Sequence, residues 1–259
     1  MDTLRAQWAA GKPTFGGWLA IPSSATAETA ARAGFDYVCV DGQHGVTDYQ
    51  VTVSMIQAIV FGGSTPIARV PWNEPGIIGK MLDAGAYGIV VPMVNSAAEA
   101  EAVVRACRYA PDGTRSFGPV LVSMRDRAYT TNANADVATI PMIETVEALK
   151  NIDEILAVPG VDAIYMGPAD LSLSLGLPPG NNDDRSEFTD ALAHITAACK
   201  RHGVVAGCHA TGALAARRME QGFQMITVAG DMLAMRTKMS EELATARTES
   251  TPDAPKSVY

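Results

Sequence analysis

The chain has 259 residues, of which 47% are hydrophobic and 19% charged, and its 28 acidic and 20 basic side chains give a formal net charge of −8. This balance excludes a disordered chain, and an acidic excess without a basic cluster argues against nucleic acid as the main partner. No apolar run approaches the roughly 20 residues of a membrane helix, and the first residues lack the apolar stretch of a signal peptide. We therefore expect a cytoplasmic protein with no membrane partner.

Short apolar runs rich in β-branched residues alternate with amphipathic stretches along the whole chain. Parallel strands that are buried on both faces have this nearly continuous apolar character. The predicted strands, in chain order, are Thr14–Ala20, Tyr37–Asp41, Pro66–Val70, Gly88–Val91, Ala138–Ile143, Ala163–Met166, Val204–Gly207 and Met225–Val228.

Helix signals lie between these runs. Thr47 and Ser96 each begin a capping-box pattern, and Gly34 and Gly85 follow helical stretches, where a left-handed turn is needed. Eight strand–helix units in this length predict a single (β/α)8 barrel, an α/β fold of the TIM type, over residues 1–248. An open doubly wound sheet is the alternative, but no G-x-G-x-x-G follows the first strand.

Two segments depart from the alternation. Pro111–Asp136 is polar, rich in Arg, Gly and Asn, and lies between the fourth and fifth strands. Insertions of this length commonly form lids, interfaces or substrate-selecting loops, so we expect this one to shape the end of the site that takes the second substrate. Residues 249–259 are polar and contain proline, which predicts a flexible tail.

Barrel enzymes carry their chemistry at the carboxyl ends of the strands. Glu144 and Asp170 follow the adjacent fifth and sixth strands, so both carboxylates are expected to reach one divalent cation. Without a cysteine or a pair of histidines beside them, these oxygen ligands favour Mg²⁺ or Mn²⁺ over zinc. Each carboxylate could instead complement the start of a helix, but their shared rim favours the metal.

Two cationic or basic side chains end neighbouring strands. His44 follows the second strand and is a candidate general base, although a lone histidine is more often a hydrogen-bonded structural residue. His209, at the end of the seventh strand, is a second candidate. Arg69 ends the third strand, where a guanidinium can stabilise a developing oxyanion, or it forms an ion pair with Asp41 or Asp48.

Two further observations bear on the mechanism. The small residues Gly167, Pro168 and Ala169 precede a helix, whose first backbone N–H groups can bind a carboxylate. None of the six lysines falls at the carboxyl end of a predicted strand, where a Schiff-base lysine would have to stand. The sequence therefore favours metal-assisted enolate chemistry over a covalent imine.

A series of motifs runs through nearly the whole chain: GGWLAIPSS, FDYVCVDGQHG, ARVPWNEP, LDAGAYGIVVPMV, RSFGP, PMIET, VDAIYMGPADLS and the final SVY. In this order they resemble the HpcH/HpaI family of metal-dependent 2-oxo acid aldolases, which includes 4-hydroxy-2-oxoheptanedioate and 2-dehydro-3-deoxyglucarate aldolases. The resemblance implies a (β/α)8 barrel, a divalent metal such as Mg²⁺, Mn²⁺ or Co²⁺, no organic cofactor, and a homo-oligomer that is often a hexamer built from dimers.

The resemblance also implies a role for each candidate residue. Glu144 and Asp170 would be the metal ligands, His44 the proton acceptor and Arg69 the transition-state stabiliser, and Asp83 would raise the basicity of the histidine. Gly167, Pro168 and Ala169 would contact the substrate carboxylate, Ala169 through its backbone, and Trp18 would be a further substrate contact.

Three positions complicate this transfer. The family commonly has Glu where this chain has Gln43, and Gln where it has Met142, so the surroundings of the histidine and the preference for the donor substrate are open. Asp83 precedes the fourth strand, which puts it at the end of the barrel opposite His44. Either that helix end is irregular, or Asp83 serves the site of a neighbouring subunit.

We expect reversible cleavage of a 4-hydroxy-2-oxo acid to pyruvate or hydroxypyruvate plus an aldehyde. A citryl-CoA-type lyase shares the metal chemistry but would need a nucleotide-binding patch, and no obvious basic one is present. A sugar-phosphate isomerase would need phosphate-binding loops after the last two strands. A non-catalytic barrel that binds 2-oxo acids is the remaining alternative.

Overall fold

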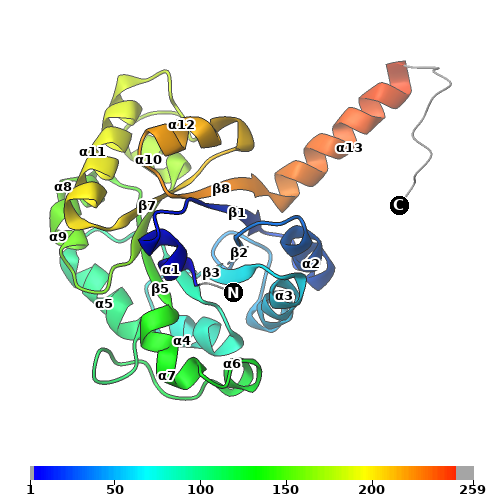
Figure 1. Cartoon of the computed structure of the whole chain (residues 1–259). Coiled ribbons are helices and arrows are strands. Elements are labelled where there is room, and N and C mark those ends of the chain that lie inside the picture. Colours follow the sequence, from blue (N-terminus) through cyan, green and yellow to red (C-terminus); the bar gives the residue numbers. More distant parts are fainter. Residues whose placement is uncertain (1–2, 249–259) are drawn as a thin grey trace.

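The computed structural model describes residues 3–248 and shows eight parallel strands closed into a barrel, with helices outside it (Figure 1). The strands pair in chain order and the last returns to the first, which confirms the predicted (β/α)8 fold. The strands are β1 (Thr14–Leu19), β2 (Tyr37–Asp41), β3 (Thr65–Arg69), β4 (Gly88–Val91), β5 (Ala138–Ile143), β6 (Ala163–Met166), β7 (Val205–His209) and β8 (Met225–Gly230).

Helical segments follow every strand, and one helix precedes the first. They are α1 (Leu4–Ala9), α2 (Ser24–Arg32), α3 (Tyr49–Gly62), α4 (Pro75–Ala84), α5 (Ala97–Cys107), α6 (Val120–Arg125), α7 (Tyr129–Asp136), α8 (Val146–Lys150), α9 (Ile152–Leu156), α10 (Pro168–Ser174), α11 (Ser186–His202), the 3₁₀ turn η1 (Gly212–Leu214), α12 (Ala215–Glu220) and α13 (Asp231–Thr248). No helix within residues 3–248 is long and apolar enough to cross a membrane.

The helix boundaries largely follow the signals in the sequence. Ser96 caps α5 as predicted, accepting the N–H of Glu99. The start of α3 differs, because Asp48 is its cap, while the hydroxyl of Thr47 donates to the backbone of Asp41. An aspartate can accept the free N–H groups of a first turn as well as a threonine can, so the helix starts one residue later than the capping-box pattern indicates.

Two apolar layers hold the barrel together. The larger one lies between the strands and the surrounding helices, and the smaller one fills the barrel interior. Leu4 and Trp8 of α1 belong to the interior cluster, and the indole N–H of Trp8 donates to Thr14 at 2.9 Å. Helix α1 therefore closes the amino-terminal end of the barrel and leaves the opposite end for chemistry.

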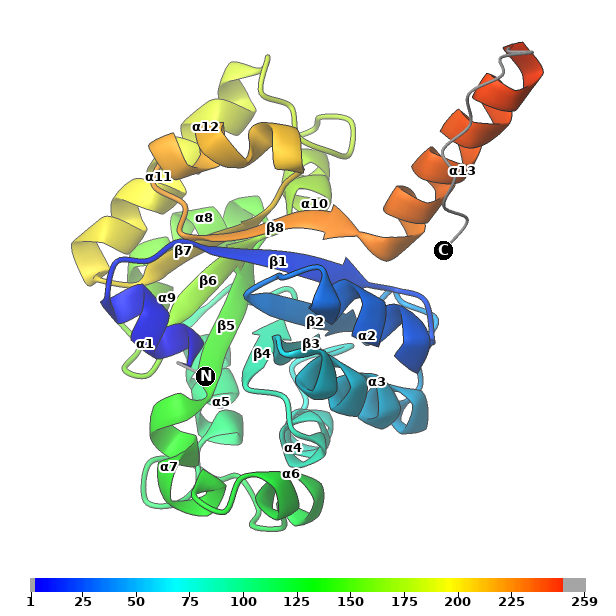
Figure 2. The ribbon, with the colours of Figure 1, turned by 45° about the vertical axis from the view of Figure 1, so that its right-hand side comes forward.

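The segment predicted as an insertion, Pro111–Asp136, contains α6 and α7 and lies against the end of α4 (Figure 2). Arg125 donates to the carbonyl of Ala84, and Tyr87 donates to Asp126, both at 2.7 Å. These partners come just before β4, at the amino-terminal end of the barrel. Within the chain, the insertion therefore lies away from the rim that carries the predicted site residues, because it follows a helix rather than a strand.

Helix α13 extends away from the barrel in both views (Figures 1 and 2). Its large apolar side chains are about half exposed or more: Met232, Leu233, Met235, Met239 and Leu243. The barrel expected over residues 1–248 is thus not packed along its last helix. The tail predicted at 249–259 lies outside the described residues.

Candidate active site

The carboxyl ends of β2, β3, β5 and β6 bring most of the predicted site residues to one rim of the barrel. Asp41 and Arg69 pair across β2 and β3, and the charges of Arg69 and Asp170 both act on Glu144. This neighbourhood is what parallel strands in a closed barrel impose, since their ends meet at the same face.

Asp41 is a buried acceptor shared by several site residues. Arg69 donates to it from Nε at 2.9 Å and from Nη2 at 2.5 Å, and the indole of Trp18 donates at 3.1 Å. The backbone N–H groups of Gln43 and His44 donate to its Oδ1. Burial alone would raise the pKa of Asp41, but Arg69 holds it below its ordinary value, so the pair is ionised.

This arrangement fixes the guanidinium of Arg69 but, among the described residues, leaves one of its nitrogen atoms free to donate. Its guanidinium lies over the ring of Trp18, with 5.0 Å from Cζ to the ring centroid. Its Nη1 atom has no hydrogen-bond partner among residues 3–248. The ion pair with Asp41, which the sequence offered as an alternative role, is therefore compatible with a role in binding an oxyanion.

Glu144 is 2% exposed and only half satisfied. The backbone N–H of Met93 donates to Oε1 at 2.8 Å, whereas Oε2 is buried without a partner. Met93 has a φ of 57°, a left-handed conformation unusual for a side chain of this size. Burial, followed by repulsion from Asp170, raises the pKa of Glu144 to about 7, against the N–H of Met93 and the charge of Arg69.

The small residues after β6 leave room beside this carboxylate. A Cβ atom on Gly167 would lie 2.5 Å from Oε2 of Glu144 and 2.9 Å from the end of Met142. Pro168 begins α10, no side chain caps it, and Ala169 and Asp170 are exposed in its first turn. The first N–H groups of this helix thus have no intrahelical partner.

These residues fit a divalent cation. An orphaned carboxylate oxygen in a buried cradle, with a second carboxylate close enough to repel it, is an arrangement that a cation would relieve. Residues 3–248 contain no group of three His, Cys, Asp or Glu side chains suited to a metal. Two oxygen ligands suit a hard ion such as Mg²⁺ or Mn²⁺, whose other positions water and substrate can fill.

His44 and Asp83 are not brought together within the chain. His44 is exposed on the loop after β2, and its ring makes no hydrogen bond among the described residues. Asp83 lies in the last turn of α4 and forms a 2.7 Å ion pair with the buried Arg115. The helix end is regular, with Gly85 as a left-handed cap, so the irregular end considered from the sequence is wrong.

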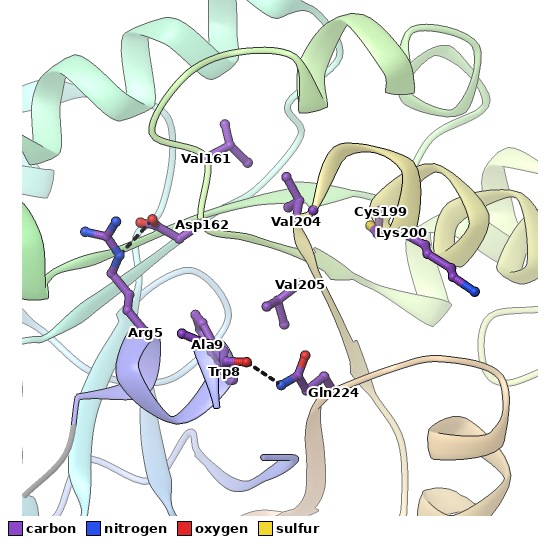
Figure 3. Close-up of a pocket in the computed structure, with 11 residues that line it drawn as sticks. Arg5, Trp8, Ala9, Val161, Asp162, Cys199, Lys200, Val204, Val205 and Gln224 are labelled. Atoms are coloured by element: carbon purple, nitrogen blue, oxygen red, sulfur yellow. Dashed lines mark hydrogen bonds and ion pairs between the residues drawn. The ribbon is translucent and has the colours of Figure 1, made fainter. Parts of the chain in front are cut away.

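A cavity of about 400 Å³ lies at the other end of the barrel, between α1 and the starts of β6 and β7 (Figure 3). Two of its charged residues, Arg5 and Asp162, pair with each other at 2.9 Å, Gln224 donates to the carbonyl of Trp8, and the third charged residue, Lys200, is exposed. Because none of the predicted site residues borders this cavity, the reaction is not assigned to it.

Comparison with known proteins identifies the family of this chain. A model of the HpcH/HpaI aldolase/citrate lyase family matches residues 14–237. This chain belongs to that family. It is 41% identical over 252 residues to a hydroxypyruvate/pyruvate aldolase of Rhizorhabdus wittichii, covering 95% of this chain and 99% of the relative.

Two further relatives extend the likeness to the whole length and to the fold. A 4-hydroxy-2-oxo-heptane-1,7-dioate aldolase of Klebsiella pneumoniae is 38% identical, with 100% of this chain and 98% of the relative covered. The crystal structure of a family protein from Burkholderia cenocepacia superposes with a TM-score of 0.88 at 32% identity, covering 96% of this chain and all of that one. The family resemblance read from the motifs is thereby confirmed.

Two residues beside the candidate site, Asp41 and His209, have a larger part in the structure than the sequence indicates. Asp41 appeared only as a possible ion-pair partner, although its position at the end of β2 was a signal for a site residue. His209 was expected to end the seventh strand only as a second candidate, and β7, which runs two residues beyond the predicted Val204–Gly207, does end on it.

The two positions at which the resemblance indicates departures from the family pattern, Gln43 and Met142, lie close to candidate site residues. Met142 is 2% exposed and belongs to the interior cluster beside Gly167. The side-chain oxygen of Gln43 is buried without a partner. Met142 makes the side of the site next to Gly167 apolar. Gln43 keeps a polar group next to His44.

Proposed function

We propose that this protein is a divalent-metal-dependent aldolase that reversibly cleaves 4-hydroxy-2-oxo acids to pyruvate or hydroxypyruvate plus an aldehyde. The observation that carries the proposal is the half-satisfied carboxylate of Glu144 beside Asp170 and Arg69. Family membership and the named aldolases among its relatives support the same reaction.

In this proposal Glu144 and Asp170 hold the cation, which is Mg²⁺, Mn²⁺ or Co²⁺. When bound, it supplies Lewis acidity toward the carboxylate and 2-oxo oxygens of the substrate. The backbone N–H of Ala169, at the start of α10, contacts the substrate carboxylate, with Gly167 and Pro168 keeping that approach open.

His44 moves the proton. In the synthetic direction it takes a proton from carbon 3 of the 2-oxo acid, directly or through water, and in the cleavage direction it takes the proton of the 4-hydroxyl. Arg69 holds the enolate oxygen that forms as the carbon–carbon bond breaks, because Asp41 has already fixed its guanidinium. Trp18 is a further contact of the donor, and its ring, against the guanidinium of Arg69, forms the floor of the site.

An aldol screen tests this proposal. Pyruvate and hydroxypyruvate are each offered with a panel of aldehydes, with EDTA and with added Mg²⁺, Mn²⁺ or Co²⁺, and the product is identified by mass. We expect activity that EDTA abolishes and the metals restore. Activity that survives EDTA, trapping by borohydride with pyruvate, or turnover of an acyl-CoA instead would refute it. Metal-dependent pyruvate binding without exchange of its carbon 3 protons would indicate a non-catalytic barrel.

We further propose a homo-oligomer, such as a hexamer built from dimers. The exposed apolar side chains of α13, from Met232 to Leu243, support an assembly, because monomeric proteins rarely leave such a surface open. Light scattering coupled to size exclusion measures the mass directly. The cytoplasmic location predicted from the sequence stays a prediction, which cell fractionation can check.

In the oligomer Asp83 is proposed to act on His44 of a neighbouring subunit. Its position at the end of α4, away from the rim of its own barrel, supports this arrangement. Mixed oligomers of Asp83→Asn and His44→Ala chains are then expected to regain activity that neither parent has. No recovery after verified subunit mixing would contradict shared sites.

A further inference from the structure

One titratable side chain at the carboxyl end of a barrel strand has no part in the reaction proposed above. His209 ends β7, and its ring meets Trp18 edge-on with 5.4 Å between centroids. Trp18 in turn stacks on Tyr165 at 5.3 Å and lies under the guanidinium of Arg69 at 5.0 Å. His209 therefore shares the floor of the site with the residue that holds the enolate oxygen.

A chain of hydrogen bonds through the barrel interior fixes the orientation of this ring. The hydroxyl of Tyr165 donates its only proton to Thr227 at 2.6 Å, and Thr227 also bonds to Tyr37 at 3.0 Å. Nδ1 of His209 lies 3.2 Å from the same Tyr165 oxygen. Since that oxygen has no second proton, Nδ1 must be the donor, and the proton of the neutral imidazole sits on Nδ1.

The remaining ring nitrogen, Nε2, is consequently a lone-pair acceptor. Burial, followed by the charge of Arg69, lowers the pKa of His209 to about 4, so the ring is neutral near pH 7. Nε2 has no hydrogen-bond partner among residues 3–248, and His209 is only partly buried, which leaves this nitrogen for a ligand. A neutral acceptor held in one orientation selects a hydroxyl group over a methyl group.

We propose that His209 is a specificity-determining residue whose Nε2 accepts a hydrogen bond from a hydroxyl group on carbon 3 of the 2-oxo acid donor. The site then favours a hydroxylated donor, such as hydroxypyruvate, over pyruvate. This inference rests on the proposed aldolase function and deepens it.

The depth of His209 decides which substrate it meets. It lies on the same floor as the buried Trp18 and Arg69, where the 2-oxo acid must bind to place its oxygen against the guanidinium. In the proposed reaction the aldehyde arrives after the donor, and the side of the site that stays open is the one where His44 is exposed. A hydroxyl on the donor is therefore the one within reach of Nε2.

Two substitutions separate the hydrogen bond from the shape of the ring. His209→Phe keeps a planar ring against Trp18 but removes the acceptor, and His209→Gln places an amide oxygen near the position of Nε2. His194→Phe, on the exposed face of α11, controls for the loss of a histidine. For each, kcat/KM is measured for hydroxypyruvate and pyruvate with one aldehyde, and calorimetry in Mn²⁺ gives the affinity for each donor without turnover.

We expect His209→Phe to lower the hydroxypyruvate-to-pyruvate ratio of kcat/KM about tenfold, mainly through the hydroxylated donor, as for a lost neutral hydrogen bond in a buried site. His209→Gln should stay within about threefold of wild type, and His194→Phe should leave the ratio unchanged. Retained activity of His209→Phe with pyruvate shows that the variant is folded.

An unchanged ratio in His209→Phe, or an equal fall in His209→Gln, would overturn the assignment while leaving the aldolase proposal intact. If the wild type turns over neither donor but binds hydroxypyruvate more tightly than His209→Phe does, the reaction is wrong and the hydrogen bond stands. Equal affinities of wild type and His209→Phe for hydroxypyruvate would also refute the inference.

Discussion

Replacing Glu144 by glutamine is expected to stabilise the metal-free protein increasingly as the pH rises. An unfolded glutamate ionises near 4.5, whereas in the fold the pKa of Glu144 is about 7. Between these values the unfolded chain loses its proton first, so ionisation of Glu144 destabilises the wild-type fold as the pH rises toward 7, and the full cost is present above it. Since one pKa unit corresponds to about 1.4 kcal/mol, the full cost is about 3 kcal/mol.

The assay is urea unfolding in EDTA at pH 5 and pH 8. The free energy of unfolding of Glu144→Gln minus that of wild type should grow by about 2.5 kcal/mol between these pH values, because part of the cost is already present at pH 5. Glutamine can still accept from Met93, and any cost of its unpartnered amide is the same at both pH values. Only the change with pH is therefore predicted.

Glu147→Gln is the matched control, since Glu147 is exposed in α8 three residues further along. Adding Mn²⁺ at pH 8 should reverse the order, stabilising the wild type but not Glu144→Gln. A difference between Glu144→Gln and wild type that is flat from pH 5 to pH 8, or that shrinks, would refute the reasoning that an ionised, half-satisfied carboxylate is held in the fold for metal binding.

Three other changes give distinct outcomes. Asp41→Asn leaves the buried charge of Arg69 unpaired, so unfolding free energy should fall by about 3 kcal/mol and kcat/KM about 100-fold; a variant as active as wild type would mean that Arg69 needs no anchor. Gly167→Ala crowds Oε2 of Glu144, and calorimetry should show Mn²⁺ affinity reduced about tenfold or more, while unaltered affinity would place the cation elsewhere. Leu243→Glu puts a charge on the apolar face of α13 and should shift sedimentation toward smaller species, with no shift arguing against an interface there.

The barrel could be predicted because its signals are local. Continuous apolar runs mark strands buried on both sides, and Gly85 and Ser96 mark a helix end and a helix start. The course of α13 could not, because its apolar residues, such as Met239 and Leu243, read equally well as a helix that packs on its own barrel. Which surface covers such a helix depends on contacts that sequence periodicity does not encode.

The candidate site was predictable to the extent that its residues stand at or just after strand ends. Arg69 ends β3 and Glu144 follows β5 directly, while Asp170 lies in the first turn of the helix after β6. The acceptor role of His209 depends instead on where the protons of Tyr165 and Thr227 go, and these residues come from β6 and β8, which only the closed barrel brings next to β7. Hydrogen bonds between strands far apart in sequence leave no local pattern to read.

The shared carboxylate of Asp41 has a consequence for how this enzyme can change. Arg69, Trp18 and the backbone of His44 all donate to it, so a substitution at one of them alters the geometry of the others. Effects of paired substitutions within this set should be strongly non-additive. A single substitution within this set therefore lowers activity through several residues at once. We expect gradual changes in substrate range to arise from substitutions outside the set, at positions such as Met142 and His209.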